Sequence, residues 1–446
     1  MGPYGDYLII FAVSVVGSYL FTFPATRLAV RMKAVAKPGD SHIHAKPTPV
    51  VGLGLLSGFL LAMLTAYFLP GLRQIFTNSL QPLGVVMAAV VIYLVGLIDD
   101  IRDISPPAKV AGQVLAAMFL VYLGVTMFYF KLPFLSGIYT LSPSILPLIT
   151  ALWVVGMTNA INIIDGLDGL AAGIVAIASA ALAIYGFKLM AMGVLPGGVN
   201  DLGPLVAVMA CGVAIGFLPH NFHPAKVFMG DSGAMLLGLF MAVSTMVIGG
   251  RTGGTAAVDV SGLTFFRFAP LFIPFFILGV PIVDTVFAIL RRTIGRKGVA
   301  TRDLGHLHHR LVSLGHGHRR AVLVLWAWTL VLSAFILYPV FNSKVNAYVP
   351  IGAGVLGVGL YTLFRPGFKK VAVNGSDLEA AAEDISGQDD VDGEPDRSHL
   401  DERYVTADHN VIQPSSSGIA IYQPTYNREY GLNVQSGAGE DSQVMG

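Results

Sequence analysis

The chain has 446 residues, of which 54% are hydrophobic and only 12% are charged, and its formal net charge is +1. Soluble globular proteins carry about 25% charged residues, so this composition excludes an ordinary soluble domain and indicates a protein with many membrane spans. The balanced charge gives no indication of nucleic-acid binding. The single cysteine, Cys211, excludes a disulfide within the chain.

Apolar stretches long enough to cross a bilayer, which takes about 20 residues, recur along the first 364 residues. The pattern predicts an all-α fold, a polytopic membrane bundle of about eleven transmembrane helices. The predicted spans are 7–30, 50–70, 82–98, 108–130, 145–161, 168–190, 203–219, 232–250, 268–290, 321–341 and 346–364.

Clusters of basic residues follow the first, ninth and last spans, whereas the alternate loops hold one or two each. Because basic loops stay in the cytoplasm, we expect the N-terminus outside a plasma or inner membrane and the candidate site and C-terminus inside. Residues 1–370 are expected to form the transmembrane catalytic domain. Residues 371–446 are acidic and then rich in Ser, Gly, Gln and Asn, which predicts a disordered cytoplasmic tail.

Asp99 and Asp100 follow the third span in the sequence Asp-Asp-Ile-Arg-Asp. Adjacent carboxylates repel each other, and a shared divalent cation or a proton relieves that repulsion. Magnesium suits such a pair because it takes oxygen ligands and often bridges to phosphates. A solvated helix end is the alternative. Lys109, at the start of the next span, is either an interfacial anchor or a point charge for a phosphate.

Four polar residues at three-residue spacing, Asn159, Asn162, Asp165 and Asp168, end the fifth span. In a helix such residues share a face. Polar groups are costly in a membrane helix, so their presence is a functional hypothesis by default. Asparagine also bonds between helices, but two amides and two carboxylates with two glycines exceed what packing requires.

The loop 219–233 contains Asn221, Phe228 and Asp231. Asp231 opens a helix between two glycines, which places a carboxylate beside helix N–H groups, although an ordinary N-cap is the alternative. Phe228 is either a packing residue or a platform for a base. His220 and His223 are interpreted as loop residues.

Two basic segments complete the set of motifs. Residues 302–310 hold three histidines within four positions beside two arginines, which favours an anion clamp. No cysteine or second acidic partner stands at the spacing of zinc ligands, so a zinc site is not expected there. The first loop, 44–49, is a short turn with basic side chains. The residues concerned are Arg302, His306, His308, His309, Arg310, His44 and Lys46.

These motifs occur in the order Asp-Asp-x-x-Asp, Asn-x-x-Asn-x-x-Asp-Gly-x-Asp-Gly, Pro-Ala-x-x-Phe-Met-Gly-Asp-x-Gly and His-x-His-His-Arg. Over residues 7–364 the chain resembles the polyprenyl-phosphate N-acetylhexosamine-1-phosphate transferases. The resemblance implies transfer of a sugar 1-phosphate from a UDP-sugar to a polyprenyl phosphate, such as undecaprenyl phosphate, with release of UMP. That reaction starts the synthesis of a cell-envelope polysaccharide.

The resemblance also implies a Mg²⁺ ion, with Mn²⁺ as the alternative, held by Asp231 and Asn162. It implies catalytic roles for Asp99, Asp100 and Asp231, a lysine near the lipid phosphate at Lys109, and an aromatic that stacks on uracil at Phe228. The residues expected to contact substrates are Lys109, Asn159, Asp165, Asp168, Asn221, Phe228, Arg302, His306, His308, His309, Arg310, His44 and Lys46.

The form His-Leu-His-His-Arg looks like the N-acetylglucosamine branch, because the peptidoglycan-precursor branch carries three histidines followed by tyrosine. UDP-N-acetylglucosamine is therefore favoured as donor over UDP-N-acetylmuramoyl-pentapeptide. A transporter is the alternative from another class, and it predicts midplane charges and internal repeats. Prenyl transfer leaves the Phe-Met-Gly-Asp and histidine-rich segments unexplained. The longer spaced pattern of a CDP-alcohol phosphotransferase, with Ala-Arg and further Asp residues, is missing after Asp168. A homodimer is left open.

Overall fold

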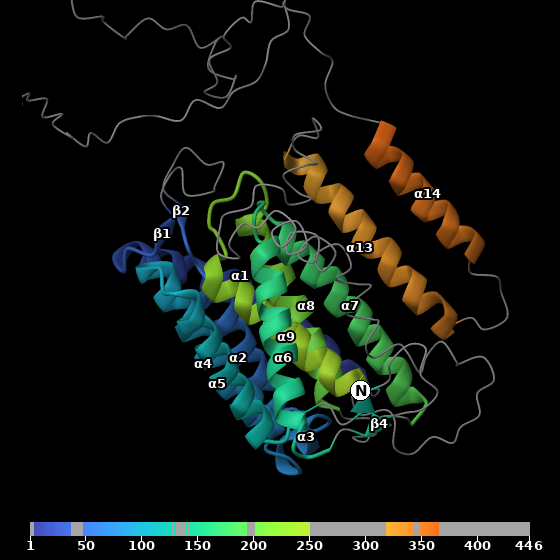
Figure 1. The fold of residues 1–446 in the computed structure, drawn as a ribbon, viewed down its shortest axis with the longest axis horizontal. Coiled ribbons are helices and arrows are strands. Elements are labelled where there is room, and N and C mark those ends of the chain that lie inside the picture. Colours follow the sequence, from blue (N-terminus) through green and yellow to red (C-terminus); the bar gives the residue numbers. More distant parts are fainter. Residues whose placement is uncertain are drawn as a thin grey trace, which may run out of the picture. The chain divides into compact units, whose positions relative to one another are not determined.

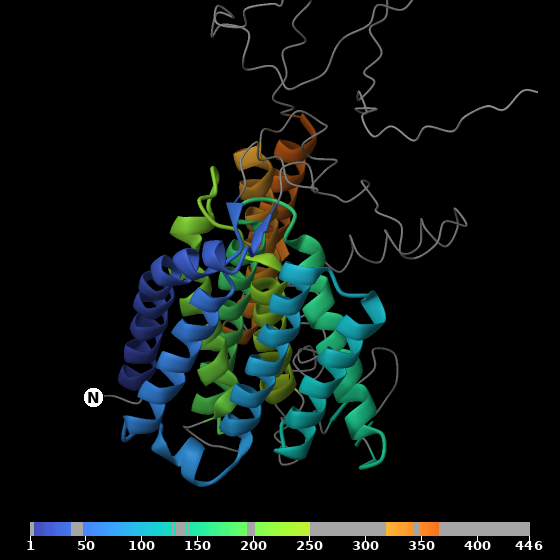
Figure 2. The same ribbon diagram turned by 90° about the vertical axis from the view of Figure 1, so that its left-hand side faces the viewer.

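The computed structural model describes residues 4–36, 48–126, 129–130, 139–140, 142–193, 201–249, 318–341 and 348–364 (Figures 1 and 2). All of these ranges belong to one compact unit, residues 1–369. Residues 370–446 form a second unit that lies wholly outside the described residues. The predicted disordered tail and the predicted ninth span, 268–290, therefore also lie outside them.

The described part of the chain is helical, with two very short antiparallel strand pairs. In β1–β2, Val35 pairs with Pro49, and in β3–β4, Tyr129 pairs with Thr140. The elements are α1 (Gly5–Arg31), β1 (Val35–Ala36), β2 (Thr48–Pro49), α2 (Leu53–Phe68), α3 (Arg73–Thr77), α4 (Gln81–Arg102), α5 (Pro106–Tyr122), β3 (Tyr129–Phe130), β4 (Tyr139–Thr140), α6 (Leu146–Ile164), α7 (Leu170–Ala191), α8 (Leu202–Asn221), α9 (Gly230–Gly249), α13 (His318–Phe341) and α14 (Tyr348–Phe364).

Six of the described helices, α1, α4, α6, α7, α8 and α9, are long and apolar enough to cross a membrane by length and composition. The helix α5 is shorter than the span predicted at 108–130. It ends at Tyr122 because Gly124 takes a left-handed conformation (φ +84°) and Val125 N–H turns back to the carbonyl of Leu120. The predicted span 108–130 was too long because the residues that follow Gly124 are also apolar.

The helices α7, α8 and α9 are apolar on all sides, which is typical of helices inside a bundle. α9 packs against α4, α6 and α8, while α1 packs against α2 and α8. In Figure 1 α13 lies beside α7, and α14 lies beyond α13. By contrast α1 exposes a stripe of large apolar residues that suits contact with lipid: Leu8, Val16, Leu20 and Phe23.

The ends of the helices bring the sequence motifs to one end of the bundle. The C-terminal ends of α4, α6 and α8 and the N-terminal ends of α5, α7 and α9 carry them. Val51 N–H donates to the carbonyl of Phe228 (2.8 Å), which ties the segment after β2 to the loop between α8 and α9. This is the end at which β1 and β2 lie in Figure 1.

Close contact of α6 with α9 depends on a glycine. A Cβ atom at Gly238 would lie 2.6 Å from Cα of Thr158 and 2.8 Å from the carbonyl oxygen of Met157. We expect Gly238→Val to push the two helices apart at a cost of about 1–3 kcal/mol. The midpoint of thermal unfolding in detergent should fall by several degrees.

The matched control is Gly156→Val on α6, where the described structure places no heavy atom within 4 Å of an added Cβ. Its unfolding midpoint should stay close to that of the unaltered protein. Equal losses in the two variants would contradict close packing at Gly238.

Candidate active site

The ammonium of Lys109 lies among acidic and amide groups from three other helices. Its Nζ donates to Oδ2 of Asp99 at the end of α4 (2.9 Å) and contacts Oδ2 of Asp231 at the start of α9. The Asn162 amide on α6 is oriented so that both its oxygen and its nitrogen form hydrogen bonds. The amide oxygen accepts from Lys109 Nζ (2.9 Å), and the amide nitrogen donates to Oδ1 of Asp231 (3.0 Å). We call these four residues the lysine centre.

Asp100 points to a different partner from its neighbour Asp99. Its Oδ1 accepts from the backbone N–H of Asp231 (2.8 Å) and its Oδ2 accepts from that of Ser232 (3.1 Å). Asp100 therefore caps the N-terminus of α9, where N–H groups lack partners within the helix. The adjacent carboxylates predicted to act as a pair are thus divided between a cap and the lysine centre.

The start of α9 fits against Asp100 because two glycines leave room there. Gly230 has φ +66°, and a Cβ atom at this position would lie 2.8 Å from Oδ1 of Asp100. A Cβ at Gly96 of α4 would collide with the backbone of Ser232. The absence of a side chain at Gly230 and Gly96 is consequently a condition for placing Asp231 beside Lys109.

Asn159 lies one turn before Asn162 and bonds to another helix. Its Nδ2 donates to Oε1 of Gln113 on α5 (2.7 Å) and to the carbonyl of Val155 (2.7 Å). Gln113, which is fully buried, also donates to Sδ of Met235 on α9 (3.1 Å). Asn159 thus bonds to α5 and to its own helix, and the substrate contact that the sequence predicts for it stays a prediction.

Sequence reasoning missed Gln113, although a signal existed. Gln113 is a polar residue in an apolar run, four positions after Lys109, and residues four apart share a helix face. It links α5 to α6 and α9 directly below the lysine centre. It therefore holds the three helices that carry Lys109, Asn162 and Asp231 in register.

Asp165 follows α6 and faces several other carboxylates. Burial, together with the nearby charges of Asp231, Asp100 and Asp168, raises the pKa of Asp165 from its ordinary value to about 8. The site therefore holds more carboxyl groups than the one ammonium of Lys109 can pair with, and near neutral pH Asp165 keeps its proton. Because all these groups offer oxygen atoms, the site fits a hard divalent cation such as magnesium.

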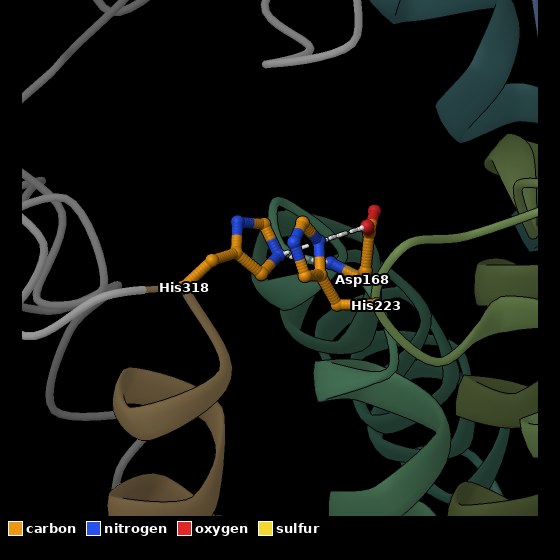
Figure 3. Close-up of side chains that lie close together, drawn as sticks. All are labelled: Asp168, His223 and His318. Carbon is orange, nitrogen blue, oxygen red and sulfur yellow. Dashed lines mark hydrogen bonds and ion pairs between the residues drawn. The ribbon is translucent and has the colours of Figure 1, made fainter. Parts of the chain in front are cut away.

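Asp168, at the turn between α6 and α7, is bonded to two histidines (Figure 3). Its Oδ2 accepts from Nδ1 of His223 (2.8 Å) and from the backbone N–H of Ala225 (3.1 Å), both in the loop between α8 and α9. Its backbone N–H donates to Nε2 of His318, the first residue of α13 (3.0 Å). His223 is therefore more than the loop residue that the sequence predicted, and His318 is a residue the sequence analysis missed.

Two other predicted residues fasten the same loop. Asn221, which is 2% exposed, accepts from the N–H of Gly169 (3.0 Å) and donates to the carbonyl of Val227 (3.1 Å). Phe228 pairs by its backbone with Pro49 and Val51, and its side chain is buried (8% exposed). Stacking of uracil on this ring stays a prediction.

The remaining predicted site residues lie outside the residues that the structure describes. They are His44 and Lys46 in the first loop, and Arg302, His306, His308, His309 and Arg310 in the loop before α13. The predicted anion clamp stays a prediction for the same reason.

The division between Asp99 and Asp100 can be tested with matched substitutions. We expect Asp100→Asn to lower the unfolding midpoint of the purified protein, because a capping carboxylate contributes about 0.5–2 kcal/mol. Asp99→Asn should change that midpoint less, because Lys109 keeps its contact with Asp231. Thermal unfolding in detergent measures both, and an equal loss in the two variants would contradict the assigned cap.

The raised pKa of Asp165 predicts a pH dependence. In the folded protein Asp165 keeps its proton up to about pH 8, whereas in the unfolded chain it loses the proton near pH 4. The free energy of unfolding therefore has its full contribution from this group below pH 4, and that contribution is lost as pH rises through about 8. In metal-free buffer the unfolding midpoint should therefore fall between pH 5 and 8.5, and less steeply in Asp165→Asn. Parallel curves for the two proteins would show that Asp165 does not cause the fall.

Comparison with known proteins gives one family. The profile described as glycosyl transferase family 4 matches residues 82–249. Decaprenyl-phosphate N-acetylglucosaminephosphotransferase of Mycobacterium tuberculosis is 37% identical over 368 residues, covering 81% of this chain and 89% of the relative.

Two more distant relatives fit the same picture. A probable undecaprenyl-phosphate N-acetylglucosaminyl 1-phosphate transferase of Bacillus subtilis is 35% identical over 321 residues, 72% of this chain and 81% of the relative. Phospho-N-acetylmuramoyl-pentapeptide-transferase of Staphylococcus aureus is 28% identical over 306 residues, 65% and 84% of the two chains. The chain therefore belongs to glycosyl transferase family 4, as a multi-pass membrane protein of the polyprenyl-phosphate N-acetylhexosamine-1-phosphate transferase type.

Proposed function

We propose that this protein transfers N-acetylglucosamine 1-phosphate from UDP-N-acetylglucosamine to a polyprenyl phosphate and releases UMP. The observation that carries the proposal is the lysine centre, which places one ammonium among carboxylates at one end of an apolar bundle. The relatives named for N-acetylglucosamine transfer are also more similar to this chain than the muramoyl-pentapeptide relative. A transporter does not account for charges gathered at helix ends.

Magnesium is the cofactor that we propose, with Asp231 and Asn162 as the residues that would hold it. The oxygen atoms of these residues and the excess of carboxylates at Asp165 support the choice. When bound, such an ion would neutralise the pyrophosphate of the nucleotide sugar and stabilise the departing UMP. Manganese would use the same ligands.

The reaction joins two anions, so its barrier depends on charge neutralisation. An oxygen of the lipid phosphate attacks the sugar-linked phosphorus, the bond from that phosphorus to the bridging oxygen breaks, and UMP leaves with the electron pair. Lys109 supplies a fixed positive charge for the lipid phosphate. Asp99 holds the Lys109 ammonium from the side of α4 and is the residue placed to orient the attacking phosphate or accept a proton from it.

Direct attack is preferred over a covalent intermediate on a carboxylate. A phosphate monoester is already largely ionised near neutral pH and needs no activation to act as nucleophile. Asp99 and Asp100, the adjacent carboxylates, are both engaged, one with Lys109 and the other with the N-terminus of α9. Inversion at the transferred phosphorus would agree with this preference, and retention would favour the covalent route.

The orientation in the membrane is also proposed. The basic residues at and beyond the C-terminal end of α1 and after the last span, among them Arg31, Lys33 and Lys369, support a cytoplasmic location for these ends. The site would then face the cytoplasm and the N-terminus the outside.

The deciding experiment is UMP release by the purified protein in detergent. We expect release from UDP-N-acetylglucosamine only when both polyprenyl phosphate and magnesium are present. Asp231→Asn should lower kcat at least about 100-fold with little change in thermal unfolding, as loss of a group that stabilises transition-state charge does. Lys109→Ala should raise the KM for polyprenyl phosphate more than the KM for UDP-N-acetylglucosamine.

The control is Lys188→Ala near the other end of α7, which should leave both KM values unchanged. Turnover of UDP-N-acetylmuramoyl-pentapeptide in place of UDP-N-acetylglucosamine would contradict the proposed donor. Full activity of Asp231→Asn would contradict the proposed metal ligand.

A further inference from the structure

A cluster outside the lysine centre joins three segments that are far apart in the chain. Asp168 comes from the α6–α7 turn, His223 from the α8–α9 loop and His318 from the first residue of α13 (Figure 3). The rings of His223 and His318 stack with centroids 4.3 Å apart and an interplanar angle of 23°. We call this cluster the histidine clasp.

The hydrogen bonds of the clasp assign a role to each ring. Nε2 of His318 accepts from the backbone N–H of Asp168 (3.0 Å), so that nitrogen carries a lone pair and the ring is neutral with its proton on Nδ1. Nδ1 of His223 lies 2.8 Å from the Asp168 carboxylate and donates to it. One histidine therefore holds the backbone of Asp168 and the other holds its side chain.

The clasp stabilises a buried acidic group. The Asp168 side chain is 4% exposed, and a carboxylate out of water needs hydrogen-bond donors to stay in place. His223 and the N–H of Ala225 supply two donors to the same oxygen, Oδ2. Next to it, Gly169 N–H donates to Asn221, so the turn and the α8–α9 loop are joined twice.

The ligand atoms of Asp168, His223 and His318 lie within 4.8 Å of one another, which could suit a transition metal. Each of these atoms, however, already takes part in a hydrogen bond within the clasp. Nε2 of His318 faces an N–H, and Oδ2 of Asp168 faces two donors. A metal ion would have to displace three hydrogen bonds, so the geometry favours a hydrogen-bonded clasp.

We propose that His223 and His318 are positioning residues that hold Asp168 and the adjoining turn in the conformation that binds the uridine nucleotide. The inference rests on the proposed function and on the family resemblance, which implies that Asp168 contacts a substrate and that Phe228 stacks on uracil. Both reach the site on segments that the clasp joins: the turn 165–169 and the loop 222–229. Neither histidine contacts the lysine centre in the described structure, so loss of the clasp should change nucleotide affinity more than chemistry.

The test compares alanine and conservative variants of both histidines. Glutamine places an acceptor where Nε2 of His318 lies, and asparagine places a donor where Nδ1 of His223 lies. We expect His318→Ala and His223→Ala each to raise the KM for UDP-N-acetylglucosamine about tenfold with kcat within about threefold. His318→Gln and His223→Asn should restore the KM to within about threefold.

The matched control is His220→Gln in the last turn of α8, just before the same loop, where the sequence predicted a loop residue. The His220 ring bonds the carbonyl of Tyr19 on α1 (3.2 Å) and stacks outside the clasp, so its KM should stay unchanged. A loss of kcat without a change in KM, or failure of both conservative variants to restore the KM, would overturn the proposal. So would a stoichiometric transition metal in the purified protein that is lost in His318→Ala.

Calorimetric binding of UMP to the purified protein separates this inference from the proposed function. If the protein binds UMP and the alanine variants bind it about tenfold more weakly, the positioning role of the two histidines is supported even where no lipid-dependent UMP release is found. If the protein releases UMP as proposed but the alanine variants bind UMP as tightly as the unaltered protein, the positioning role of the two histidines is contradicted and the proposed function is not.

Discussion

The structure depends on one partly buried ammonium that lies between two carboxylates. Lys109 and Asp99 have side chains only 15% and 11% exposed, and charges this far from water are costly unless they are paired. Loss of the shared ammonium would leave both carboxylates without this partner, which for a buried pair typically costs about 3–5 kcal/mol. Since Asp99, Lys109, Asn162 and Asp231 come from four different helices, this requirement fixes how the ends of α4, α5, α6 and α9 meet.

Packing between the apolar parts of the same helices also brings their ends together at the lysine centre. Gly96 lets the start of α9 approach α4, and Gly238 lets α9 approach α6. Gln113 then links α5 to both α6 and α9 through Asn159 and Met235. Small residues and buried amides are the usual means of helix association in lipid, where burial of apolar surface contributes little. The helix contacts and the ion contacts thus determine each other.

The loop between α8 and α9 connects the lysine centre to the histidine clasp. It follows Asn221 at the end of α8, which holds the α6–α7 turn, and leads to Gly230, which lets α9 start against Asp100. Between them, Phe228 is joined to the segment after β2, and His223 to Asp168. A single loop therefore sets the positions of the carboxylate at Asp231 and of the carboxylate at Asp168.

The sequence by itself determined the class of the protein and indicated the polar residues that the described structure gathers at one end of the bundle. Apolar runs indicated the helices of the described part. Polar residues at the ends of these runs, Asp99, Lys109, Asn162, Asp165 and Asp231, stood out as functional candidates. The cost of removing a polar group from water depends on the residue and its local surroundings, so the sequence alone can show it. The order of the motifs was enough to indicate the family that the comparisons show.

Only the tertiary structure decided which polar group bonds to which. Asp99 and Asp100 are adjacent and chemically identical, yet one holds Lys109 and the other caps α9, because they leave the helix in different directions. His318 lies 150 positions from Asp168, and no local pattern marks it as a partner. Hydrogen bonds form between groups that the fold brings within about 3 Å, and that proximity is a property of the packed helices.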